Sequence, residues 1–161
     1  MKIALIRHGE AENSLPDEHR SLSAQGKLDI MSLATFLRGT RWKFQSAFHS
    51  PLTRTTQTAG ILADGLECEK EPWTVLRPGA SPEGVASELS TLKASGAFAL
   101  VFHMPDVARV ASYFLGTSES SFYIPPGTVI GLNLPARPSP GSGLLLFTLQ
   151  PEFSAGLAVR S

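Results

Sequence analysis

The sequence predicts an α/β fold with three layers: a mostly parallel central sheet, helices on either side of it, and a C-terminal antiparallel hairpin. Short apolar runs alternate with helical segments over roughly the first 115 residues, which is the pattern of units that build a parallel sheet. The last third instead holds two apolar runs, 129–134 and 144–149, around a turn rich in Pro, Gly and Ser. These two runs predict an antiparallel hairpin at one edge of the sheet.

The predicted strands of the parallel part are short, and the clearest of them are apolar on both faces. The first is the run 3–6, which leads directly into Arg7. Three more are predicted at 46–49, 73–76 and 98–102. Because the carboxyl ends of parallel strands point to one edge of a sheet, we expect the residues that follow them to meet there.

Between these strands the sequence predicts helices with recognisable ends. Ser23 is expected as the N-cap of the first helix, and Pro82 stands at the first position of the third. Gly65 and Gly116 are expected to stop the second and the fourth. The predicted helices span 23–38, 51 or 52 to 64, 82–93 and 106–115.

Composition limits the classes of function. The chain has 161 residues, of which 42% are hydrophobic and 17% charged, so a single packed domain over residues 1–161 is expected. Basic and acidic residues balance at 14 each, which gives no electrostatic argument for nucleic acid or an acidic membrane as partner. The lone Cys68 excludes an internal disulfide and a multi-cysteine metal site. The first apolar stretch is too short for a signal peptide or a membrane span, and we expect a cytoplasmic protein.

Arg7-His8-Gly9, directly after the first strand, is the most informative segment of the chain. An Arg and a His at a strand end suit anion binding and nucleophilic attack, although such a tripeptide is common by itself. Two further positions recur in the same setting: Arg54 lies in the first turn of the second helix, and His103 follows the strand 98–102. Two guanidinium groups and two imidazoles beside helix N-termini would suit a phosphoryl group.

Four segments, in this order, resemble the histidine phosphatase (phosphoglycerate mutase-like) superfamily. They are RHGEA at 7–11, RSLSAQG at 20–26, SPLTRTTQT at 50–58 and FHMP at 102–105. The short chain, the RHGEA form and the His-x-Pro form are most similar to the SixA-type phosphohistidine phosphatase branch. The resemblance implies the phosphoglycerate mutase-like form of the predicted fold.

The resemblance also implies roles for individual residues. His8 would be the nucleophile that becomes phosphorylated, while Arg7 and Arg54 would bind the phosphoryl oxygens. His103 would complete the phosphate pocket, as a cation during turnover. Arg20 matches an arginine that binds phosphate or orders the loop. No cofactor and no metal is implied, because the two arginines and His103 supply the positive charge that a metal ion would otherwise bring.

The chemistry of imidazole agrees with the role of His8. A neutral imidazole is a competent nucleophile near neutral pH, since its ordinary pKa is about 6.5. Only one ring nitrogen can attack, so the other should donate a hydrogen bond to a fixed acceptor. We expect that acceptor to be a backbone carbonyl near Gly9.

The general acid that many members of the superfamily use has no clear counterpart. Glu83 is a possible general acid, and Glu88 lies in the same region. Asp106 follows His103 by three positions. The plainer interpretation of Glu83 and Asp106 is helix N-terminal charge, and that of Glu88 is a solvated helix face.

The missing acid bears on the substrate. A phosphorylated imidazole leaves as a neutral ring, whereas a phosphate ester must expel an alkoxide unless an acid protonates it. The chain also has no obvious insertion to roof the site, so an open pocket could admit a side chain of another protein. Both points predict a phosphatase for protein phosphohistidine, with a phosphotransfer domain as a possible partner.

Two alternatives remain open. The first is a phosphomonoesterase for a small phosphate ester, with Glu83 or Glu88 as the acid. The second is a phosphate- or phosphoprotein-binding module without catalysis, which the presence of all four core residues disfavours. His49, just before SPLTR, could border the pocket and is interpreted as a structural residue.

Overall fold

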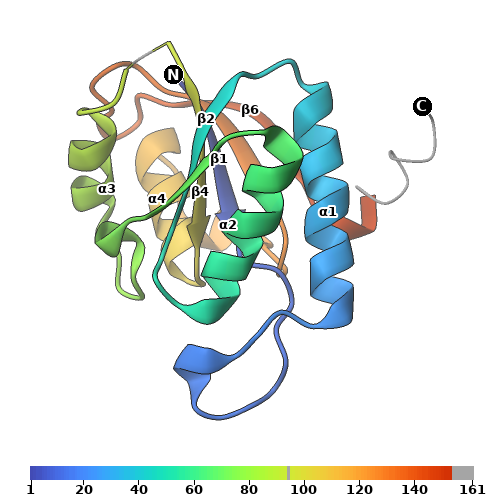
Figure 1. The fold of residues 1–161 in the computed structure, drawn as a ribbon. Coiled ribbons are helices and arrows are strands. Elements are labelled where there is room, and N and C mark those ends of the chain that lie inside the picture. Colours follow the sequence, from blue (N-terminus) through green and yellow to red (C-terminus); the bar gives the residue numbers. More distant parts are fainter. Residues whose placement is uncertain (94, 154–161) are drawn as a thin grey trace.

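The computed structural model describes residues 1–93 and 95–153, which form one six-stranded sheet in the order β3-β2-β4-β1-β5-β6. The first four strands along the chain run parallel, β5 is antiparallel to β1, and β6 is antiparallel to β5 (Figure 1). The strands are β1 (Lys2–Arg7), β2 (Phe44–His49), β3 (Glu69–Pro72), β4 (Ala97–Phe102), β5 (Val129–Asn133) and β6 (Leu144–Leu149).

Helices cover both faces of this sheet and produce two apolar cores. One face packs against α1 and α2, through residues such as Ile6 and Val101. The other face packs against α3 and α4, through residues such as Leu5 and Leu100. The helices are α1 (Ala24–Gly39), α2 (Thr53–Leu66), α3 (Pro82–Leu89) and α4 (Asp106–Leu115), with short 3-10 helices η1 (Asp17–His19), η2 (Thr74–Leu76) and η3 (Glu119–Ser121).

The predicted fold class is confirmed, together with most of its elements. The Ser23 side chain caps α1 by accepting a hydrogen bond from the Gly26 N–H at 3.0 Å. Gly116 ends α4 with a φ of 66°, in the left-handed region where glycine has no steric cost. In the described part of the chain, no helix combines the length and the apolar character needed to cross a membrane.

The third predicted strand is wrong in position. The strand is Glu69–Pro72, while Thr74–Leu76 forms the 3-10 helix η2. All four residues of β3 are exposed, because β3 is the edge of the sheet beside β2. An exposed edge strand carries no apolar pattern, so its charged sequence concealed it.

The ends of two helices also differ from prediction. Gly65 does not stop α2, which continues to Leu66 and ends with Glu67 in the left-handed region at a φ of 56°. A Cβ on Gly65 would lie only 2.7 Å from Cβ of Ala34, so this glycine serves the close packing of α1 against α2. The helix α3 ends at Leu89, four residues earlier than the sequence pattern predicts.

Candidate active site

The carboxyl ends of β1 and β4, which are neighbours in the sheet, carry the two histidines of the predicted site. Arg7 is the last residue of β1 and His8 follows it, while His103 follows β4. The His8 N–H donates to the Phe102 carbonyl at 3.0 Å, so the two strand ends stay in register beyond the ladder. The His8 and His103 rings lie with their centroids 5.4 Å apart.

Hydrogen bonding leaves one nitrogen of His8 available. Nδ1 of His8 lies 2.7 Å from the Gly9 carbonyl oxygen. Since a carbonyl oxygen only accepts, Nδ1 carries the proton and donates it, and Nε2 keeps its lone pair in the neutral ring. This is the arrangement predicted from the chemistry of a nucleophilic imidazole.

The predicted anion-binding side chains hold buried donors that the protein itself leaves unused. Arg7 Nε, Arg54 Nε and both ring nitrogens of His103 are buried, and none has a hydrogen-bond partner within residues 1–93 and 95–153. Leaving such a group unsatisfied costs about 1–3 kcal/mol, so buried polar groups are nearly always paired. Their concentration around His8 indicates a site built for an anion.

The positive charges around His8 also act on its pKa. Burial lowers the pKa of His8 to about 4, against the effect of the Gly9 hydrogen bond, and the neighbouring His103, Arg54 and Arg7 lower it further. Burial, followed by the charge of Arg54, lowers the pKa of His103 to about 4 as well. Both rings are therefore neutral near pH 7 in the anion-free site. A cationic His103 during turnover would need the negative charge of a bound phosphoryl group.

Two local features bring the loop after β1 close to α1 and α2. Gly9 is tightly packed, because a Cβ there would lie 3.0 Å from the carbonyl oxygen of Gly26 and from the Ile30 side chain. The Gly9 N–H donates to Thr58 Oγ1 at 3.1 Å, and the same hydroxyl donates to the Arg54 carbonyl at 2.8 Å. The first and third of the resembling segments, which are far apart in the sequence, thus share one hydrogen-bond network.

Arg20 orders the loop between β1 and α1. Its Nε donates to the Glu12 carbonyl at 2.7 Å, and its NH1 donates to Asp17 Oδ1 at 3.1 Å. Arg54 reaches the same loop, because its NH1 donates to the Asp17 carbonyl at 2.8 Å and its NH2 to Asp17 Oδ2 at 3.1 Å. Sequence reasoning did not single out Asp17. The only signal in the sequence is its spacing of three residues from Arg20.

The structure does not bring the suggested acids into the hydrogen bonds of the site. Glu83 is exposed in the first turn of α3, and the described residues show no hydrogen bond from it to His8 or His103. Glu88 is likewise exposed. Asp106 is buried and accepts from the Gly79 N–H at 3.0 Å while pairing with Arg109, which ties α4 to the preceding loop. Within residues 1–93 and 95–153, no group of three or more His, Cys, Asp and Glu side chains is placed to hold a metal ion.

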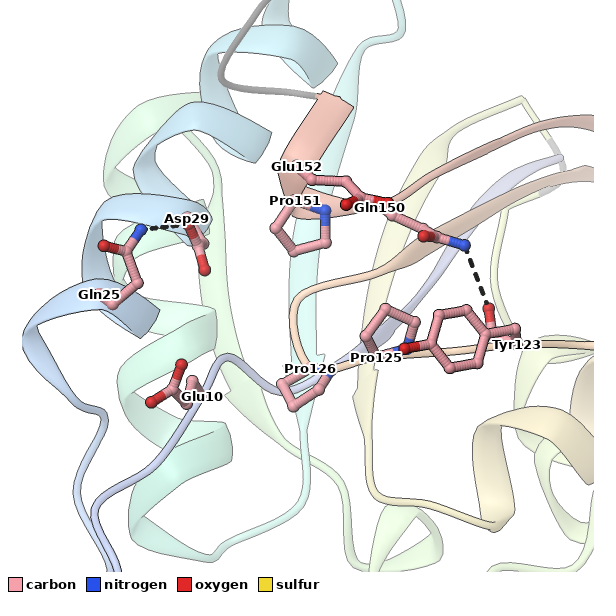
Figure 2. Close-up of a pocket in the computed structure, with 9 residues that line it drawn as sticks. All are labelled: Glu10, Gln25, Asp29, Tyr123, Pro125, Pro126, Gln150, Pro151 and Glu152. Atoms are coloured by element: carbon pink, nitrogen blue, oxygen red, sulfur yellow. Dashed lines mark hydrogen bonds between the residues drawn. The ribbon is translucent and has the colours of Figure 1, made fainter.

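A groove of about 420 Å³ is lined in part by the loop that follows β1, although neither His8 nor His103 lines it. Figure 2 shows its walls, with Glu10 on the loop after β1 and Tyr123 on the segment before β5. It adjoins the site because Glu10 follows His8 by two positions, and because Arg7 NH1 donates to the Ile124 carbonyl at 2.8 Å. The lining residues are Glu10, Gln25, Asp29, Tyr123, Pro125, Pro126, Gln150, Pro151 and Glu152.

One protein family matches part of this sequence. Residues 3–78, slightly less than half of the chain, match the family model of the histidine phosphatase superfamily (branch 1). This stretch includes Arg7, His8 and Arg54 and ends before His103. No curated protein matches the sequence.

Solved structures with the same fold include two SixA proteins. The protein histidine phosphatase SixA, solved with tungstate, is 21% identical with a TM-score of 0.85, and the match covers 95% of this chain and 99% of that one. A protein of Nakamurella multipartitia, described as a putative phosphohistidine phosphatase SixA, is 19% identical with a TM-score of 0.78, over 93% of this chain and 95% of that one. The family match over residues 3–78 and the shared fold confirm the resemblance of this chain to the histidine phosphatase superfamily and, in fold, to its SixA-type branch.

Proposed function

We propose that this protein is a metal-independent phosphatase that works through a phosphorylated His8. The observation that carries this proposal is the free Nε2 of His8 beside buried, unpartnered donors of Arg7, Arg54 and His103. Nε2 attacks phosphorus as the bond to the leaving group breaks, and water then hydrolyses the phosphoenzyme. The guanidinium and imidazole donors hold the phosphoryl oxygens, where charge in a loose transition state needs positioned cations rather than covalent help.

The substrate that fits this site best is phosphohistidine on a protein. Its imidazole leaves as a neutral ring, so the first step needs no carboxylic acid, and Glu83 shows no hydrogen bond to the site. The adjoining groove offers room for a polypeptide beside the phosphoryl group, and its carboxylates Glu10, Asp29 and Glu152 would repel small anionic sugar phosphates. The fold shared with a protein histidine phosphatase that binds tungstate, an oxyanion shaped like phosphate, supports the same choice.

A trapping experiment with the purified protein tests the proposal. Rapid mixing with ³²P-phosphoramidate should label the wild type with acid-labile, base-stable phosphohistidine, and His8→Ala should take up no label. His19→Ala is the matched control, since His19 is an exposed histidine at the end of η1, and it should label like the wild type. Tight phosphate binding without any label would instead identify a binding module.

Substrate preference is tested with the same preparation. We expect kcat/KM for a phosphohistidine protein to exceed that for sugar phosphates by at least about 10²-fold, as expected when a needed general acid is missing. Equal or better turnover of sugar phosphates would favour the small-molecule phosphomonoesterase, and Glu83→Gln would then have to lower it.

A further inference from the structure

The carboxylate of Asp17 is fixed between two arginines at the mouth of the site. Its Oδ1 accepts from Arg20 NH1 and its Oδ2 from Arg54 NH2, each at 3.1 Å. A third hydrogen bond, from Arg54 NH1 to the Asp17 backbone carbonyl at 2.8 Å, fixes the residue itself. Although held in this way, the Asp17 side chain is 59% exposed, so solvent water reaches it.

Asp17 lies at the edge of the sheet where the strand that carries His8 ends. It begins η1, the short blue helix that stands beyond the carboxyl ends of the parallel strands (Figure 1). Its negative charge is close enough to His103 to raise the pKa of that ring, against the stronger effects of burial and Arg54. A phosphoryl group on His8 that contacts Arg54 would therefore lie close to the Asp17 carboxylate, which the same guanidinium group holds.

Hydrolysis of a phosphoenzyme needs a proton acceptor near the attacking water. Water attacks phosphorus opposite Nε2 of His8, so the P–O bond forms as the P–N bond breaks. The electron pair of the P–N bond returns to Nε2. His8 leaves as a neutral ring, because Nδ1 keeps its proton and donates it in a hydrogen bond to the Gly9 carbonyl. The attacking water must lose one proton, and His8 cannot take it in the in-line geometry.

We propose that the Asp17 carboxylate orients this water and accepts its proton, so that Asp17 acts in the second half-reaction and not in the first. The inference rests on the proposed function, since it presupposes a phosphorylated His8. Asp17 then passes the proton to solvent, to which it is open, and the products are inorganic phosphate and the free enzyme. Glu83 and Glu88 have no part in this step.

The pairing of Asp17 with arginines is compatible with this task. Hydrogen bonding to Arg20, followed by the charge of Arg54, lowers the pKa of Asp17, which keeps it ionised and able to accept. In a loose transition state the new P–O bond is barely formed, so the water proton leaves late and orientation matters more than strong basicity. Arg20 and Arg54 supply that orientation by holding both carboxylate oxygens.

The two half-reactions separate this proposal from a structural role. With ³²P-phosphoramidate in a rapid-quench apparatus, Asp17→Asn should slow hydrolysis of phospho-His8 by about 10²-fold, the usual loss for a general base. Formation of phospho-His8 should change by less than about 3-fold, because the isosteric amide still accepts from Arg54 and the first step needs no base. Labelled enzyme should therefore accumulate. Glu18→Gln, the neighbouring exposed carboxylate of η1, is the matched control and should leave both rates unchanged.

A second variant, Asp17→Ala, tests whether Asp17 also stabilises the conformation of the loop. In Asp17→Ala, added formate should restore part of the hydrolysis rate, since a small carboxylate can occupy the vacated position. A parallel fall in both half-reactions without formate rescue would reduce Asp17 to a positioning residue for Arg54 and overturn the proposal. An unchanged hydrolysis rate in Asp17→Asn would overturn it as well. Absence of any labelled wild-type enzyme would instead contradict the proposed function itself.

Discussion

Two buried histidines at the ends of neighbouring strands differ in only one visible respect. His49 ends β2 and His103 follows β4, and each is 4% exposed. Nδ1 of His49 lies 2.7 Å from the Ser50 carbonyl and 3.3 Å from Thr56 Oγ1. His103 has both ring nitrogens buried without a partner in the described structure.

This difference separates a structural histidine from one available for a ligand. Burial disfavours the charged form of both rings and lowers both pKa values. The hydrogen bonds of His49 compensate for its burial, whereas nothing in the described residues compensates for that of His103. We infer that the free-energy cost of burying the unpaired His103 nitrogens is recovered when an anion binds. This difference between His103 and His49, and the role of the charges beside His103, can be tested.

The largest effect on activity is expected when His103 is replaced by asparagine, and the same replacement at His49 provides the comparison. His103→Asn should lower kcat/KM for phosphoramidate by about 10²- to 10³-fold, because it removes a donor to the phosphoryl oxygens. His49→Asn should lower it by less than about 3-fold, yet reduce the free energy of unfolding by about 1 kcal/mol through the lost buried hydrogen bond. Steady-state kinetics and urea unfolding of both variants measure the two quantities. Similar losses of activity in both would end the contrast.

The pH dependence of the free energy of unfolding should show that the burial of the His103 ring is not compensated by hydrogen bonds. His103 has a pKa of about 4 in the folded protein against about 6.5 in an unfolded chain, so the unfolded state binds more protons between these values. The free energy of unfolding should therefore fall as the pH drops from 6.5 to 4, by about 3 kcal/mol for this ring. His8 contributes in the same direction.

Urea unfolding at several pH values measures this slope. His103→Asn should flatten it in this window. An identical slope in the variant and the wild type would show that His103 titrates normally.

The variant Arg54→Lys keeps the positive charge at this position but removes the planar guanidinium group, and so separates the effect of charge from that of geometry. Arg54→Lys should lower kcat/KM for phosphoramidate by about 10²-fold, because an ammonium cannot reproduce the planar fork that reaches Asp17 and the phosphoryl group together. Arg38→Lys is the matched control, since Arg38 forms an exposed pair with Glu67 on the surface. A loss of less than tenfold at Arg54 would mean that charge alone suffices.

The smallest effect is expected at Arg20, which contacts the loop and one oxygen of Asp17. Arg20→Gln should lower kcat/KM by less than about tenfold, because Asp17 keeps its hydrogen bonds to Arg54 and a single exposed ion pair contributes little. Limited proteolysis within the loop 10–21 should become faster. A loss of 10² or more would assign Arg20 a direct contact with the phosphoryl group.

The predicted fold followed the sequence wherever burial gave the sequence a pattern. β1 and β4 are buried on both faces and read as continuous apolar runs, and α4 has one apolar face and a glycine stop. The position of β3 was not predicted, because this edge strand is stabilised by its hydrogen-bonded pairing with β2 and its exposed residues show no apolar pattern. The predicted end of α2 at Gly65 was wrong, because glycine also occurs where two helices pack closely, as it does here.

The candidate site divides in the same way. His8, Arg7, Arg54 and His103 could be singled out because each stands beside a strand end or a helix start that the sequence itself marks. Asp17 could not, since its significance lies in hydrogen bonds across 37 residues of chain to the Arg54 side chain. No local pattern reports a contact of that range.

The sequence by itself determined most of the succession of strands and helices along the chain and the edge of the sheet at which the cationic side chains meet. These follow from local hydrophobic periodicity and from covalent neighbours. Only the tertiary structure decided which buried histidine is satisfied, which carboxylate binds Arg54, and how deeply the rings are desolvated. Those properties depend on atoms brought together by packing, and the free energy of an unpaired buried group exists only once the surrounding chain has excluded water from it.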